Sequence, residues 1–158
     1  MAATKAVTWG DLVAQAPILA RAAQRIFESH PHHVIATTKR DGSPRVGGTN
    51  VFFSNGNLWI GAMPSALRNR DLRRDPRCAI HSAPLDEHLH VGDVRLDLLA
   101  EELVGEEALA LLRSSGHEGE GVVFVLRVSE ISLVRVEASQ LVIDSWDPVA
   151  GGRTARLG

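Results

Sequence analysis

The chain has 158 residues, of which 44% are hydrophobic and 23% charged, a composition typical of a globular protein rather than of disordered or repetitive chains. Its 17 Lys and Arg against 19 Asp and Glu give a net charge of −2, so we expect no general attraction to nucleic acid or to an anionic membrane. We expect one soluble, cytoplasmic domain over residues 1–158, because the single cysteine fits a reducing compartment and no segment approaches the roughly 20 apolar residues of a membrane span.

The first 30 residues are expected to form a helical N-terminal arm. Thr8 is placed to cap a short helix that ends near Pro17, and Pro17 suits the first turn of a second helix. Apolar residues then recur at helical spacing: Ile18, Leu19, Ala22, Ala23, Ile26 and Phe27.

The next part of the chain has the pattern of strands and tight turns. Residues 33–39 and 45–53 are rich in β-branched side chains and flank the turn pair Asp41-Gly42. A second turn pair, Asn55-Gly56, precedes a strand over residues 58–63. These segments predict a three-stranded antiparallel meander.

Further elements follow in short succession. Ser65 is placed to cap a helix from Ala66 to about Arg74. We expect strands over residues 77–83, 93–104, 122–136 and 141–146, a helix over 106–113, a glycine-rich loop over 116–121 and a C-terminal tail over 147–158. Many antiparallel strands with few short helices favour a small, mainly β barrel over a parallel α/β sheet.

A candidate anion site lies where the strand over residues 58–63 meets the following helix. Backbone N–H groups at a helix start, the hydroxyl of Ser65 and the guanidinium of Arg68 together suit a phosphate group. The alternative is that Arg68 and Arg70 belong to a solvated face and pair with Asp71 and Asp75.

A second candidate region is the strand that carries Arg45. Strand alternation places Arg45, Gly47 and Thr49 on one face. The glycine pair Gly47-Gly48 would let a flat ligand lie against the sheet, although such a pair also suits a bulge or a barrel corner.

These segments, in this order and spacing, resemble the pyridoxamine 5'-phosphate oxidase-like FMN-binding split β-barrel proteins. The resemblance runs from about Ile26 to Trp146. It rests on Val34-Ile-Ala-Thr, Asp41-Gly-Ser-Pro-Arg45, Leu58-Trp-Ile-Gly61, Arg68-Asn-Arg-Asp-Leu-Arg-Arg-Asp-Pro-Arg77, Gly92-Asp93 and Trp146-Asp-Pro.

The resemblance implies an antiparallel, Greek-key-like split barrel that forms a homodimer, with FMN or the deazaflavin coenzyme F-420 at the subunit interface. By position it implies a cofactor site made of Arg45, Gly47, Thr49, Ile60, Gly61, Ala62, Met63, Ser65, Arg68, His81, Ser82 and Trp146. Arg45, Ser65 and Arg68 would hold the phosphate, the 60–63 strand edge would face the ring, and His81-Ser82 would come from the second subunit.

Two departures from the family pattern argue against vitamin B6 oxidation as the reaction. The chain has no Tyr and ends Arg156-Leu157-Gly158, whereas true pyridoxamine phosphate oxidases resemble one another in an Arg-x-His tail and a Tyr for the substrate phosphate. We therefore expect a flavin-dependent oxidoreductase for another small substrate, with hydride or electron-pair transfer at the flavin ring and no assigned catalytic side chain. The alternatives are a non-catalytic flavin- or haem-binding carrier or sensor, and a structural dimerisation domain.

The remaining histidine, cysteine and tryptophan residues are expected to have structural rather than functional roles. His88 and His90 could form a metal site with Asp86, but solvated loop histidines are the favoured interpretation. Cys78 is expected to be a buried hydrophobe. Trp59 is expected in the core or the dimer interface rather than against a ligand, and Trp9 is expected to pack the N-terminal arm.

Overall fold

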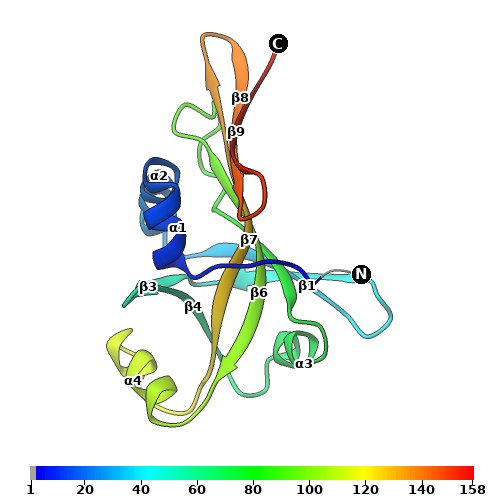
Figure 1. The fold of residues 1–158 in the computed structure, drawn as a ribbon. Helices are drawn as coiled ribbons and strands as arrows, with labels where there is room; N and C mark the ends of the chain where they lie inside the picture. Colours follow the sequence, from blue (N-terminus) through cyan, green and yellow to red (C-terminus); the bar gives the residue numbers. More distant parts are fainter. Residues whose placement is uncertain (1–2) are drawn as a thin grey trace.

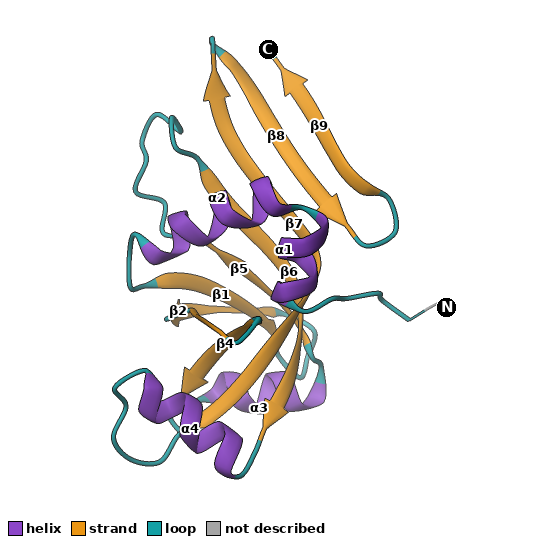
Figure 2. Ribbon diagram, turned by 60° about the vertical axis from the view of Figure 1, so that its left-hand side comes forward, coloured by secondary structure: helices purple, strands orange, loops and turns teal. Residues whose placement is uncertain are grey.

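A computed structural model describes residues 3–158, and in this range four short helices accompany a nine-stranded antiparallel sheet (Figures 1 and 2). The helices are α1 (Trp9–Gln15), α2 (Pro17–Glu28), α3 (Leu67–Arg74) and α4 (Glu106–Ser114). The strands are β1 (His33–Thr38), β2 (Pro44–Thr49), β3 (Phe52–Ser54), β4 (Asn57–Ala62), β5 (Arg77–His81), β6 (Asp93–Leu103), β7 (Val122–Glu137), β8 (Gln140–Asp147) and β9 (Gly151–Leu157). The expected mainly antiparallel β fold with few short helices is confirmed.

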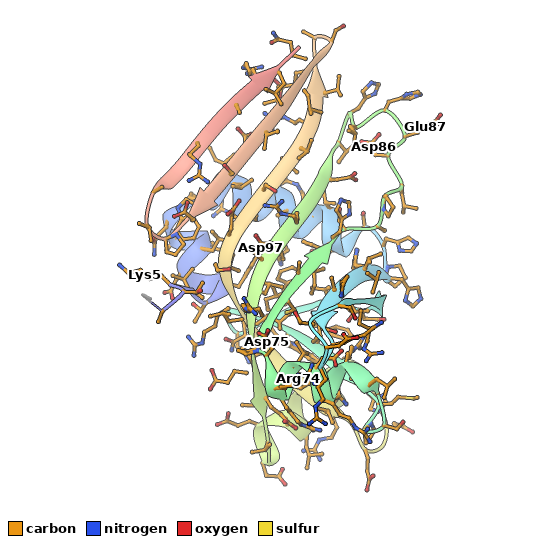
Figure 3. The ribbon with its side chains drawn as sticks, turned by 90° about the vertical axis from the view of Figure 1, so that its right-hand side faces the viewer. Lys5, Arg74, Asp75, Asp86, Glu87 and Asp97 are labelled. Atoms are coloured by element: carbon orange, nitrogen blue, oxygen red, sulfur yellow. The ribbon has the colours of Figure 1, made fainter. Side chains whose placement is uncertain are left out.

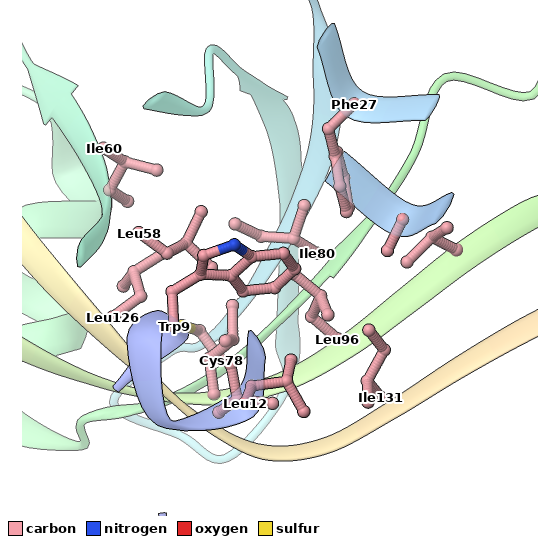
Figure 4. Packing of buried hydrophobic residues seen from close by; sticks show 14 of the residues in the cluster. Trp9, Leu12, Phe27, Leu58, Ile60, Cys78, Ile80, Leu96, Leu126 and Ile131 are labelled. Atoms are coloured by element: carbon pink, nitrogen blue, oxygen red, sulfur yellow. The ribbon is translucent and has the colours of Figure 1, made fainter. Parts of the chain in front are cut away.

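The two N-terminal helices form as the sequence predicts. Thr8 and Asp11 make a reciprocal capping box at the start of α1, and Pro17 occupies the first turn of α2. Both helices bury an apolar face against the sheet, and Figure 4 shows Trp9, Leu12 and Phe27 packed beside strand residues in the main core. The helical arm is therefore part of the hydrophobic core.

The expected meander is wrong in its pairing. The strand expected over residues 45–53 is interrupted at Asn50 and Val51, so that β2 pairs with β1 while β3 pairs with β4. The sheet order is β2-β1-β5-β6-β7-β4-β3, which places the two hairpins at opposite ends of the path. Local turn signals predicted each hairpin correctly, but they carry no information about which hairpin neighbours which.

The long strand β7 divides the sheet into two parts. β6 lines one edge of β7 over most of its length, whereas the other edge pairs first with β4 and later with β8. Val7 forms a two-bond bridge to Val128 on β7, between these two segments. β7 has a bulge opposite Asp97 and Leu98 of β6, where the extra residue, Ser129, donates its hydroxyl to the Asp97 carbonyl.

The segment expected as a C-terminal tail contains a strand. β9 pairs with β8 along its whole length, from Leu141–Leu157 to Asp147–Gly151. The Asp147 carboxylate closes the connecting turn by accepting hydrogen bonds from the amides of Val149 and Ala150, and it also binds Arg153. These bonds lower the pKa of Asp147 to about 2.

The helix start at α3 also differs from expectation. Ala66 occupies the N-cap position and no side chain caps the helix, so Ser65 does not have the predicted capping role. The turn is held instead by Asn69, which is fully buried and donates its amide Nδ2 to the carbonyl oxygens of Met63 and Pro64. Asn69, a residue inside the helix, thus stabilises the helix start, which was the role predicted for Ser65.

Candidate functional site

A cavity of about 390 Å³ lies between the end of β4, the start of α3 and the C-terminal end of α4. Its lining residues come from four stretches of the chain: Asn50, Phe52, Trp59, Gly61, Ala62, Met63, Arg68, Leu112, Ser115, Gly116 and His117. Phe52 and Trp59 stack with ring centroids 4.4 Å apart and form an aromatic wall. The cavity therefore combines apolar walls with one cationic side chain.

Arg68 links β2, at one end of the sheet order, to β4, which is next to the other end. Its guanidinium donates to the carbonyl oxygen of Gly48 on β2, at 2.7 Å, and to that of Gly61 on β4, at 2.9 Å. β3 pairs with β4 only as far as Trp59, so this edge of β4 is open to other partners from Ile60 onward. One side chain from α3 thus spans the opening between strands that lie far apart in the sheet order.

The charge of Arg68 is not neutralised by the protein. Among residues 3–158, no carboxylate lies within ion-pair distance of its guanidinium, and its Nε is buried without a hydrogen-bond partner. Burial lowers the pKa of Arg68 below its ordinary value. A half-buried cation with an unsatisfied donor beside a cavity is the arrangement that an anionic ligand group would complete.

Arg45 has a different environment. Its Nε donates to Asp71 at 2.6 Å, and the same carboxylate accepts hydrogen bonds from Thr37 and Arg74. Burial by itself would raise the pKa of Asp71, but hydrogen bonds from Arg45, Thr37 and Arg74 lower it below the ordinary value. Arg45 and Arg68 are thus held by different groups, and Arg45 is already paired with a buried carboxylate.

The two interpretations of the arginine-rich helix can now be compared. Asp71 binds Arg45 and Arg74, and Asp75 binds Arg77, so the ion pairs that the alternative interpretation gives to Arg68 and Arg70 do not form. Figure 3 shows Arg74 and Asp75 at the end of the molecule that carries α3. Within residues 3–158 the segment therefore contains structural ion pairs and two cations without a carboxylate partner, the half-buried Arg68 and the exposed Arg70.

The strand residues of the predicted site divide into two groups. Gly61, Ala62 and Met63 line the cavity, whereas Ile60 points into the main core and is fully buried. On β2, Gly47 has open space around it, and Thr49 is buried with its hydroxyl bonded to the Asn50 carbonyl.

His81 and Ser82 lie at the end of β5, outside the cavity lining. Ser82 is fully buried, and its hydroxyl accepts a hydrogen bond from the Val94 amide. The His81 ring lies on the surface, with Nδ1 2.6 Å from the Ser82 carbonyl and Nε2 3.9 Å from Asp93. Within one chain these two residues do not meet Arg68.

Trp146 lies in another part of the molecule. It lies on β8, where it pairs with Ile131 of β7 on one side and with Gly152 of β9 on the other, and it lines a groove beside α2. The predicted set of twelve residues is thus spread over several places in a single chain.

Other candidates have structural environments. Asp86 accepts hydrogen bonds from the amides of Val91 and Gly92 and so closes the loop after β5, where Figure 3 shows Asp86 and Glu87. No cluster of three or more His, Cys, Asp or Glu side chains suited to a metal ion occurs in residues 3–158. Burial raises the pKa of the Cys78 thiol to about 12, which leaves it protonated and unreactive.

Sequence reasoning missed the wall that α4 contributes to the cavity. Ser115, Gly116 and His117 follow this helix and face the same space as Arg68. The glycine-rich loop over residues 116–121 was the available signal, but the pattern does not show that the loop folds back onto β4. His117 is thereby the second titratable side chain of the cavity.

No family model and no curated protein matches the sequence, whereas many solved structures match the fold. A putative pyridoxamine 5'-phosphate oxidase from Listeria innocua is 15% identical with a TM-score of 0.58, and the match covers 70% of this chain and 93% of that one. An F420 reductase is 18% identical with a TM-score of 0.53, covering 69% and 94%. A heme binding protein from Mycobacterium smegmatis is 24% identical with a TM-score of 0.58, covering 80% and 56%.

These matches define the fold. The chain has the fold of the pyridoxamine 5'-phosphate oxidase-like proteins, as the sequence resemblance predicts. It spans a little over half of the mycobacterial protein and of Atu2129 from Agrobacterium tumefaciens, at 56% and 54% of those chains. No helix in residues 3–158 is long and apolar enough to cross a membrane.

Proposed function

We propose that this chain is a flavin-binding oxidoreductase that uses FMN or the deazaflavin coenzyme F-420 to act on a small substrate. The observation that carries the proposal is Arg68, a half-buried guanidinium beside a cavity with a buried, unpartnered Nε and no carboxylate. Both cofactors carry an anionic phosphate that suits such a group. The F420 reductase and the oxidase-like protein of the same fold support this choice.

The residues around the cavity fit a flat ligand with an anionic end. Arg68 would hold the anion and Ser65, which is exposed on the turn before α3, would add a hydroxyl. The open edge of β4 at Gly61 and Ala62 would lie along the ring, and Gly47 leaves open space on β2.

The protein would orient the ligand and exclude water, with Phe52, Trp59 and Leu112 as the apolar wall. A bound flavin supplies hydride or electron-pair transfer. We assign no side chain to acid–base catalysis.

A spectroscopic titration tests the proposal. Purified protein is titrated separately with FMN and with F-420 while ligand fluorescence and absorption are followed, and loaded protein is then mixed with NADH or NADPH. We expect saturable binding of one of the two cofactors and reduction of the bound form. Absence of saturable binding by both would contradict the proposal, and binding without reduction by these donors would favour a carrier.

A second candidate is a haem-binding carrier. The heme binding protein from Mycobacterium smegmatis shares the fold, and His117 places an imidazole, a common haem-iron ligand, at the same cavity. Titration with hemin separates the two candidates. A Soret band that shifts on binding in the parent protein and is lost in His117→Ala would support the carrier, whereas an unchanged titration in His117→Ala would remove this residue as the ligand.

We also propose that the chain forms a homodimer through the outer face of β1, β2 and β5. Val34 and Val46 are exposed on this face, at 36% and 66%, beside Ala36 and Ala79. A second subunit packed here would bring its own His81 and Ser82 toward the interface. Light scattering of the parent and of Val46→Asp tests this arrangement, with a dimer expected for the parent and a monomer for the variant.

A further inference from the structure

A second cavity lies far along the sheet from Arg68, between α2 and the projecting strands β7, β8 and β9. It is an open groove of about 1000 Å³. Its walls consist of one helical side, from Gln15 to Ala22, and one strand side that includes Leu133, Trp146 and Gly152. Figures 1 and 2 show this end of the sheet extending past α1 and α2.

Strand register shows how the floor of the groove is organised. Residues paired across neighbouring strands point to the same face, so Ile131, Trp146 and Gly152 form one row of that face. The next row toward the tip of the hairpin is Leu133, Asp144 and Thr154. The floor thus changes from an aromatic, apolar end to a polar end within two residues along each strand.

Gly152 keeps the apolar end open. Its φ is not positive, and a Cβ built on it would approach only the Ser145 carbonyl, at 4.0 Å, so the backbone does not require glycine. Because Gly152 pairs directly with Trp146, a side chain at this position would project over the same face. Trp146 itself is only 4% exposed and packs in the main core, so its ring forms the base of the groove, and Gly152 places no side chain above it.

The charged groups that line the groove are already paired. Arg135 binds Asp144 and Glu137, Arg153 binds Asp147, and Thr154 donates its hydroxyl to Asp144. A charged ligand would find no free counter-charge among these residues, in contrast to the cavity beside Arg68. The helical wall is apolar, with Ile18 86% exposed at its rim and Val91, 67% exposed, at the end of the groove.

We propose that this groove is a binding site for an uncharged, mainly apolar small molecule that carries a hydrogen-bonding group. Its apolar body would lie over Trp146 and Gly152, and its polar group would face Asp144 and Thr154. The volume is at the upper end of the ~300–1,000 Å³ range of small-molecule sites, and the concave shape between two walls suits an inserted molecule rather than a flat protein surface. The site is separate from the proposed flavin site and does not depend on it.

The test uses N-phenyl-1-naphthylamine, an uncharged fluorophore whose emission rises in apolar surroundings. It is titrated into the full chain with and without FMN, and into Gly152→Leu and Ala155→Leu. Ala155 lies on the same strand, but its side chain belongs to the opposite face. We expect one saturable site, at least a tenfold weaker affinity in Gly152→Leu, and an unchanged affinity in Ala155→Leu.

A second variant and a charged probe complete the test. Ala22→Leu fills the groove from the helical wall and should weaken binding whether or not Gly152→Leu folds. The sulfonated analogue 1-anilinonaphthalene-8-sulfonate should bind more weakly than the uncharged probe. Absence of saturable binding, or equal affinities in Gly152→Leu, Ala22→Leu and the parent, would overturn the proposal. Loss of self-association in Gly152→Leu, measured by light scattering, would instead assign the groove to contact between copies of the chain.

Discussion

The two ends of α3 place arginine in opposite electrostatic situations. In the first turn, Arg68 reaches carbonyl oxygens on two strands and has no carboxylate partner in the described chain. In the second half of the helix, Asp71 is buried and receives hydrogen bonds from Thr37, Arg45 and Arg74. The first end keeps its charge available to a ligand, whereas the second uses its charges to attach α3 to β1 and β2.

This contrast shows that an arginine-rich segment has no single role. Burial makes a charge costly in both places, and the cost is offset by a carboxylate at one end and only by carbonyl dipoles at the other. A cation that the fold buries without an ion partner is the better candidate for ligand binding.

The largest effect is expected from breaking the ion cluster at Asp71. Asp71→Asn leaves Arg45 and Arg74 without their shared carboxylate and should lower the free energy of unfolding by about 3 kcal/mol, the lower end of the range for buried ion pairs because both arginines are part exposed. Urea denaturation measures the change. Asp75→Asn removes the more exposed pair with Arg77 and should cost under about 1 kcal/mol. Equal losses in the two variants would contradict the structural role given to Asp71.

The next effect concerns cofactor affinity. Arg68→Met should weaken FMN or F-420 binding by about 1.5–3 kcal/mol, or roughly 10- to 150-fold in Kd, because it removes a hydrogen-bonded charge. Arg45→Met should weaken it less, since Asp71 already neutralises that guanidinium. Fluorescence titration gives both values, and circular dichroism verifies folding. A larger loss of cofactor affinity in Arg45→Met than in Arg68→Met would indicate that the phosphate binds at β2 instead.

A smaller effect on stability is expected from the protonation of His33 at low pH. This buried ring donates from Nε2 to the Phe27 carbonyl and accepts at Nδ1 from the Ala83 amide, so a second proton would break the latter bond. Burial is the main cause that lowers its pKa below 6.5. Because the folded pKa is the lower one, the stabilisation is complete above about pH 6.5 and is lost as the pH falls through the folded value.

Melting temperatures recorded from pH 8 down to pH 4.5 measure this loss. His33→Gln should show a shallower decline in Tm below pH 6.5 than the parent, because it removes the titrating group. His88→Gln changes an exposed loop histidine and should follow the parent curve. A curve for His33→Gln that matches the parent would show that other groups cause the decline.

The smallest effects distinguish the two helix starts. Thr8→Ala removes the capping box of α1 and should cost about 1 kcal/mol of unfolding free energy, whereas Ser65→Ala should change it by less than about 0.5 kcal/mol because Ser65 caps nothing. Urea denaturation at one protein concentration compares the two variants. A cost at Ser65 similar to that at Thr8 would contradict the cap assignment at α3.

Much of the fold could be predicted from local patterns. The turn pairs Asp41-Gly42 and Asn55-Gly56, the capping box at Thr8 and the proline at the start of α2 each act within a few residues, so their structures follow from the nearby sequence. The strand over residues 151–157 was missed because its side chains are almost all exposed and form no apolar run or alternation, so that only its pairing with β8 identifies it.

Patterns in the sequence were enough to predict a mainly antiparallel β protein, two short helices before residue 30, and basic residues gathered around α3. These properties depend on periodicity and on turn chemistry, which are short-range. Three features could be seen only in the folded chain: Arg68 bonds to both β2 and β4, Asp71 binds Arg45, and Trp146 lines a different groove. Such contacts join residues far apart in the chain, and their energies depend on distance and burial, which no local pattern contains.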